Sequence, residues 1–138
     1  MRTFKLLSVI FVIDATLSVG FGAASWMFPL STYGTIVDLS QNANPDSLII
    51  AALSGQSVFY ILIGLVCIFA SQMPSPHSSR LALVMIARHT WVGLKGLSEV
   101  DREWIVGDPW VDIYIHILFV IAYMVAVAWK YKGLRLES

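Results

Sequence analysis

Four long stretches of mainly apolar residues alternate with short polar segments along the chain. They cover about residues 4–28, 47–71, 80–97 and 110–129. A helix of about 20 residues crosses the hydrocarbon core of a bilayer, and the third stretch is the shortest and most polar of the four. Short connections favour antiparallel neighbours. The pattern therefore predicts an all-α polytopic membrane protein: a single integral-membrane domain, residues 1–138, forming an antiparallel bundle of four transmembrane helices.

Composition supports lipid as the solvent of these helices. Hydrophobic residues make up 57% of the chain and charged residues 13%, whereas soluble domains carry about 25% charged residues. The net charge is zero and no long basic stretch is present. We therefore exclude nucleic acid as a partner and expect the lipid bilayer to be one.

The distribution of cations predicts the orientation of the chain. Only Arg102 falls in a loop on the opposite side from the termini. The other side carries most of the cations: Arg2, Lys5, Arg80, Lys130, Lys132 and Arg135. Because cytoplasmic loops of membrane proteins are enriched in Lys and Arg, both termini are expected in the cytoplasm, with the protein in the cell inner membrane.

Ionisable residues inside the predicted spans are the main candidates for chemistry, because a charge at membrane depth is costly unless it is paired. Asp14 lies about ten residues into the first span and Arg88 about eight into the third, which places both roughly 12–15 Å from the same face. The sequence predicts a salt bridge between them, with His89 nearby. This inner layer is interpreted as a structural clamp; a proton relay is the alternative.

A second polar layer is expected nearer the other face. Gln56, Lys95 and His116 come out at roughly 21–23 Å, with Glu99 and Asp112 just beyond them. Lys95 can pair with Glu99, and His116 with Asp112, because each pair is four residues apart on a helix. The alternatives are a snorkelling lysine and a histidine that only packs. Any ligand or proton site is expected in this layer.

The two histidines allow a cofactor hypothesis. By the same depth count His89 lies about 10 Å shallower than His116, which disfavours a haem shared by both. A pigment or haem with His116 as its axial ligand remains an alternative, although the sequence requires no cofactor. No metal-binding or catalytic motif is present, so a non-catalytic protein is favoured.

Small residues in the spans predict close approach between helices. The candidates are Ser18, Gly22, Ala51, Gly55, Gly64, Gly93 and Gly96.

The first half of the chain resembles the small four-helix DoxX-like membrane proteins. The resemblance covers about residues 5–70, with a helix that ends near Pro29, a Tyr33-Gly34 turn and a second helix that contains Gly55 and Gly64. It implies a four-helix bundle and transfers no catalytic residue. The second half, with Arg88, His89 and Lys95, departs from this pattern.

These observations favour an accessory or assembly subunit of a larger inner-membrane complex, respiratory or photosynthetic. Other membrane subunits are the expected partners, through helix faces and the loop of residues 98–110. A small-molecule or proton-handling protein that uses the polar layers is the first alternative. A pigment- or haem-binding subunit is the second.

Overall fold

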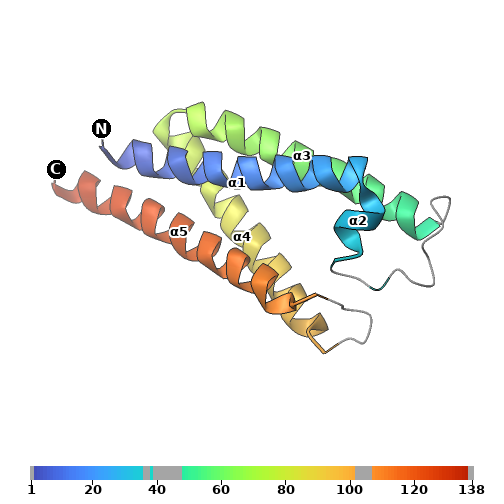
Figure 1. Cartoon of the computed structure of the whole chain (residues 1–138). Helices are drawn as coiled ribbons and strands as arrows, with labels where there is room; N and C mark the ends of the chain where they lie inside the picture. Colours follow the sequence, from blue (N-terminus) through green and yellow to red (C-terminus); the bar gives the residue numbers. More distant parts are fainter. Residues whose placement is uncertain (1, 36–37, 39–47, 102–106, 137–138) are drawn as a thin grey trace.

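The structure is a computed structural model that describes residues 2–35, 38, 48–101 and 107–136 (Figure 1). Within these residues all regular elements are helices, which confirms the predicted all-α class. The long ones are α1 (Arg2–Met27), α3 (Leu48–Gln72), α4 (Ser75–Glu99) and α5 (Pro109–Leu136), and α2 (Pro29–Tyr33) is short. In the described part of the chain, three segments are long and apolar enough to cross a membrane: Leu6–Met27, Ala51–Gln72 and Pro109–Trp129.

Helix α4 begins earlier than the sequence analysis predicted. It starts at Ser75, whereas the expected span began at residue 80. The prediction was wrong because Pro74 and Pro76 do not prevent the helix from starting at Ser75. A proline is tolerated in the first turn of a helix, where backbone N–H groups have no intrahelical partner. The His77 N–H already bonds to the Pro74 carbonyl at 3.1 Å.

The predicted end of the first span at Pro29 is confirmed, and a short helix follows it. Helix α1 stops at Met27, and Pro29 then occupies the first turn of α2. The hydroxyl of Tyr33 donates to the Leu53 carbonyl at 3.2 Å, and its ring meets Phe21 edge to face at 6.0 Å. These contacts fix α2 across the ends of α1 and α3.

The long helices pack as two pairs. Helix α1 lies along α3 and α4 lies along α5, while α3 and α4 make few contacts. The start of α1 and the end of α5 lie at the same end of the molecule, and the pairs diverge toward α2 (Figure 1). Where the pairs converge, a buried core forms from both: Leu7, Ile10, Phe11, Ala15, Cys67, Ala70, Ala82, Met85, Phe119, Tyr123 and Ala126.

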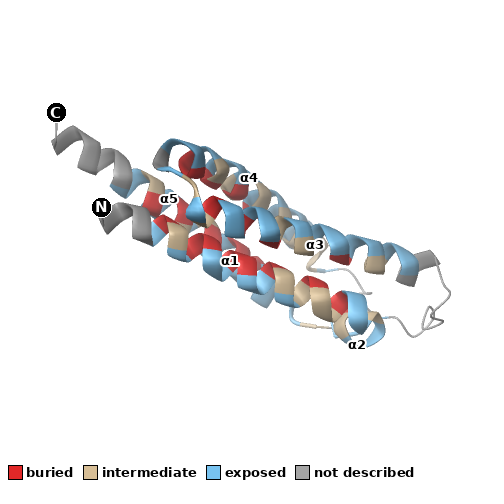
Figure 2. Ribbon diagram, turned by 90° about the horizontal axis from the view of Figure 1, so that it is seen from above, coloured by how far each residue is buried: buried red, intermediate tan, exposed pale blue. Residues whose placement is uncertain are grey.

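The outward surfaces of the helices are exposed and largely apolar (Figure 2). Helix α4 also has an apolar outward surface, although it is the least apolar of the four long helices. Its exposed large hydrophobic residues are Leu83, Val84, Trp91, Leu94 and Leu97. Apolar surface on this scale is unusual for a protein in water and indicates contact with lipid or another protein.

Close approach of α1 and α3 depends on glycine. A Cβ atom at Gly64 would clash with the Val19 side chain and lie 3.0 Å from the Ala15 carbonyl oxygen. The predicted close contact at Gly64 is therefore confirmed. At Gly55 on the same helix a Cβ atom would meet nothing within 4 Å.

We expect Gly64→Ala to lower the free energy of unfolding by about 1–3 kcal/mol, because overpacking forces the two helices apart. Gly55→Ala is the matched control. It should leave stability unchanged or raise it, since alanine is the better helix former. Thermal unfolding of both variants in the same detergent measures the difference, and an equal effect at the two positions would contradict this packing.

Candidate functional site

A cavity of about 500 Å³ lies between the two helix pairs and is lined by residues of all five helices. It contains every polar residue that the sequence analysis singled out: Asp14, Gln56, Arg88, His89, Lys95, Glu99, Asp112 and His116. The two layers expected from depth counting are therefore one continuous site. Such a concave, largely apolar space with a few convergent polar groups is typical of a small-molecule site.

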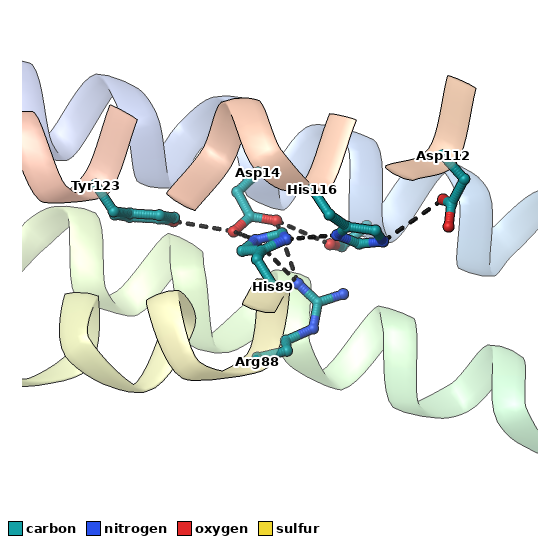
Figure 3. A network of polar contacts seen from close by, with 7 residues as sticks. Asp14, Arg88, His89, Asp112, His116 and Tyr123 are labelled. Atoms are coloured by element: carbon teal, nitrogen blue, oxygen red, sulfur yellow. Dashed lines mark hydrogen bonds and ion pairs between the residues drawn. The ribbon is translucent and has the colours of Figure 1, made fainter. Parts of the chain in front are cut away.

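Asp14 is the centre of the deep end of this cavity, and its side chain is 2% exposed. One oxygen, Oδ1, accepts from the Ser18 hydroxyl at 3.2 Å and lies 3.6 Å from Arg88 Nη1. The other, Oδ2, lies 2.9 Å from His89 Nε2 and accepts from the Tyr123 hydroxyl at 2.9 Å (Figure 3). The predicted Asp14–Arg88 salt bridge is confirmed, and three helices meet at one carboxylate.

A chain of contacts leads from Asp14 toward the exposed end of the cavity (Figure 3). His89 Nδ1 lies 2.7 Å from His116 Nδ1. His116 Nε2 lies 3.5 Å from Asp112 Oδ1, so the predicted Asp112–His116 pair is also confirmed. Exposure of the side chains rises from 2% at His89 through 10% at His116 to 63% at Asp112. The four residues form a path from a buried carboxylate to an exposed one.

The expected 10 Å separation of the two histidines is wrong. The error comes from the start of α4, because each residue of a helix adds 1.5 Å. Counted from Ser75, His89 is fourteen residues into α4, or about 21 Å deep. That is the depth expected for His116, and the two rings meet.

These contacts are satisfied by two neutral imidazole rings. The His89 Nε2–H donates to Asp14, since an ionised carboxylate only accepts hydrogen bonds. The hydrogen between the two Nδ1 atoms then belongs to His116, which donates it to His89. His116 Nε2 lies 3.5 Å from Asp112 Oδ1 and is the ring nitrogen left without a hydrogen. It is the atom at which the pair can accept one further proton.

Arg88 and the neighbouring aromatic rings fix the orientation of His89. Arg88 Nη1 lies 3.3 Å from His89 Nε2, but that nitrogen cannot both accept from Arg88 and donate to Asp14. The shorter contact and the charged acceptor favour donation to Asp14. Phe119 stacks on the His89 ring at 4.7 Å and 12°. The imidazole is therefore held in one plane.

The exposed end of the cavity carries a second ion pair. The Lys95 ammonium contacts the Glu99 carboxylate, as the spacing predicted. Lys95 is 60% exposed, and Gln56 is also exposed at the cavity wall. These residues border the entrance and take no part in the histidine chain.

The sequence analysis missed Tyr123 as a site residue. Its hydroxyl bonds directly to Asp14. The spacing of the sequence did point to Tyr123. It is seven residues from His116, so the two lie on one face of a helix, with Phe119 between them.

The histidine geometry bears on the metal and haem hypotheses. A tetrahedral metal ion bonded to both Nδ1 atoms holds them about 3.3 Å apart, and a haem iron between them about 4 Å, because each metal–nitrogen bond is about 2 Å long. The observed 2.7 Å is too short. In the described part of the chain, no group of three His, Cys, Asp or Glu residues is placed to hold a metal ion. Axial ligation through His116 Nε2 would require Asp112 to turn away.

Comparison with known proteins adds no family: no protein-family model, curated protein or solved structure matches the chain. The DoxX-like resemblance therefore stays a prediction.

Proposed function

We propose that this protein is a four-span inner-membrane protein that binds a small molecule in its cavity and couples that binding to a proton on the His89–His116 pair. The observation that carries the proposal is the continuous path Asp14–His89–His116–Asp112 along the wall of a cavity of about 500 Å³. Proton transfer needs donor and acceptor within hydrogen-bond reach, and each link except the last is 2.9 Å or shorter.

The apolar outward face of α4 supports four spans. Helix α4 is 25 residues long, the same length as α3. Its Arg88 and His89 side chains turn inward to Asp14, while Trp91 and Leu94 are 70% and 59% exposed. A helix with charges inside and hydrophobic residues outside suits a bilayer even when its average hydropathy is modest. With four spans, the cation distribution places both termini in the cytoplasm.

The path supports ligand coupling rather than a proton channel. Beyond Asp14, toward the chain termini, the described residues form the packed apolar core around Phe11, Met85 and Ala126. No further titratable chain crosses that core within the described residues.

The accessory-subunit hypothesis depends on other parts of the molecule. Residues 102–106 of the loop 98–110, including Arg102, Glu103 and Trp104, lie outside the described residues. That hypothesis stays a prediction, as does the pigment- or haem-binding alternative. The cavity and its proton-holding pair favour the small-molecule function.

Uptake into proteoliposomes tests the proposal. Wild-type protein is reconstituted and exposed to a total lipid and small-molecule extract, with and without a pH gradient, and the vesicle contents are identified by mass spectrometry. We expect at least one compound to accumulate only when both the protein and the gradient are present. Identical contents in protein-containing and empty vesicles, or uptake that ignores the gradient, would refute the proposal.

A further inference from the structure

The Asp14 carboxylate at the deep end of the cavity has no oxygen left free for a ligand. Both oxygens of Asp14 are already occupied, Oδ1 by Ser18 and Arg88 and Oδ2 by His89 and Tyr123. A ligand that brings a donor to this point finds no carboxylate oxygen left to receive it. A charged partner for the ligand at this point must therefore be the Arg88 guanidinium, which donates hydrogen bonds to an acceptor.

Arg88 supplies the unused donors. A guanidinium carries five N–H groups, and among the described residues the contacts of Arg88 use Nη1 alone. The side chain lines the cavity and is 16% exposed. Its other terminal nitrogen points away from Asp14, toward the side on which Asp112 lies (Figure 3). Because a planar guanidinium matches a carboxylate in geometry and charge, a carboxylate is the acceptor that suits it best.

The charges at the deep end limit the charge of the ligand. Asp14 and Arg88 cancel each other, and the histidine pair can accept one proton at His116 Nε2. That proton balances the single negative charge of a carboxylate, whereas a phosphate brings more negative charge than one proton can balance. Buried charge is costly unless it is compensated.

The rest of the cavity wall is suited to an apolar tail. It is formed by apolar side chains of three helices: Leu17, Phe21, Val92, Ile115 and Phe119. Helices α3 and α4 both line the cavity but make few contacts with each other.

We infer that the ligand of this cavity is an amphipathic monocarboxylate, whose carboxylate pairs with Arg88 and whose apolar tail lies along Phe21 and Phe119. The inference rests on the proposed function and specifies its ligand. The carboxylate binds together with one proton, which the His89–His116 pair takes up. Ligand and proton therefore enter as an electroneutral pair.

Calorimetric titration of wild-type protein in nanodiscs tests this inference, with empty nanodiscs as the blank for partition into lipid. The probes are decanoate, decanol and decyltrimethylammonium, which share one tail and differ in the head group. We expect decanoate to bind about tenfold or more tightly than either of the others, as a charge-assisted pair predicts. Equal binding of decanol, or preference for the cation, would overturn the ligand class without any variant being needed.

Arg88→Gln extends the test to the pairing residue, and Arg80→Gln, which replaces an exposed arginine of the same helix outside the cavity lining, is its control. Decanoate affinity should fall about tenfold or more in the first and stay unchanged in the second. An unchanged affinity in Arg88→Gln would contradict the assignment of the carboxylate to Arg88.

Titration in buffers of different ionisation enthalpy counts the protons taken up with decanoate. We expect net proton uptake in wild-type protein and none in His116→Phe. Head-group selectivity without proton uptake would remove the proton coupling and keep the ligand class. Gradient-driven uptake of other compounds from the extract, with no selectivity for decanoate, would overturn the ligand class and keep the proposed proton coupling.

Discussion

Asp14→Asn is expected to lower the free energy of unfolding by about 3–5 kcal/mol, the usual cost of removing one partner from a buried ion pair. The asparagine side chain has a similar shape but no charge. It leaves the Arg88 guanidinium, which is 16% exposed, without its counter-ion. It also places an amide where His89 and Tyr123 both donate to a carboxylate oxygen.

Asp112→Asn is the matched control for this prediction. The Asp112 side chain is 63% exposed, so its loss should cost no more than about 1 kcal/mol. The double variant Asp14→Asn/Arg88→Gln should be less destabilised than the sum of the single variants, because the two side chains share one interaction. Unfolding in detergent measures all four changes. Equal effects of Asp14→Asn and Asp112→Asn would refute the role of Asp14 as the centre of the site.

His116→Phe is expected to reduce gradient-driven uptake by about 100-fold or more, the lower end of what a positioned proton-transfer group contributes. The substitution keeps an aromatic ring beside His89 and leaves all four contacts of Asp14 in place. It removes both the Nδ1···Nδ1 bond and the contact with Asp112. Proton transfer should therefore fail, while the protein still folds.

His77→Phe controls for the loss of a histidine, because His77 is exposed near the start of α4 and does not line the cavity. Uptake by this variant should equal that of wild-type protein in the same proteoliposomes. Unfolding in detergent checks that His116→Phe retains wild-type stability. Gradient-dependent uptake that survives in His116→Phe would exclude the relay.

The sequence was sufficient for the helical class and for the composition of the site. Asp14 and Arg88 could be paired from it because a charge inside an apolar span needs a partner, and few are available. The pairs Lys95–Glu99 and Asp112–His116 followed from helical spacing alone. These contacts could be predicted because the paired residues are neighbours on one helix, or because a charge inside an apolar span requires an opposite charge.

The contact between His89 and His116 could not be predicted from the sequence in the same way. It depends on the start of α4, and an error of a few residues at a proline-rich boundary shifts every depth along the helix. The role of Tyr123 depends in addition on how α5 is rotated against α1. The merging of two expected layers into one cavity depends on the divergence of the helix pairs, which is a property of packing and not of any single span.

The central claim is that His89 and His116 are joined by a hydrogen bond between their Nδ1 atoms and take up one proton when the ligand binds. Nitrogen NMR of the protein with isotopically labelled histidine in nanodiscs tests it directly, because it reports the protonation of each ring nitrogen and the scalar coupling across a nitrogen–nitrogen hydrogen bond. We predict coupling between the two Nδ1 atoms, a hydrogen on His89 Nε2 but not on His116 Nε2 in the free protein, and hydrogens on both Nε2 atoms when decanoate is bound. Two uncoupled rings whose hydrogens do not change when decanoate is added would contradict the account.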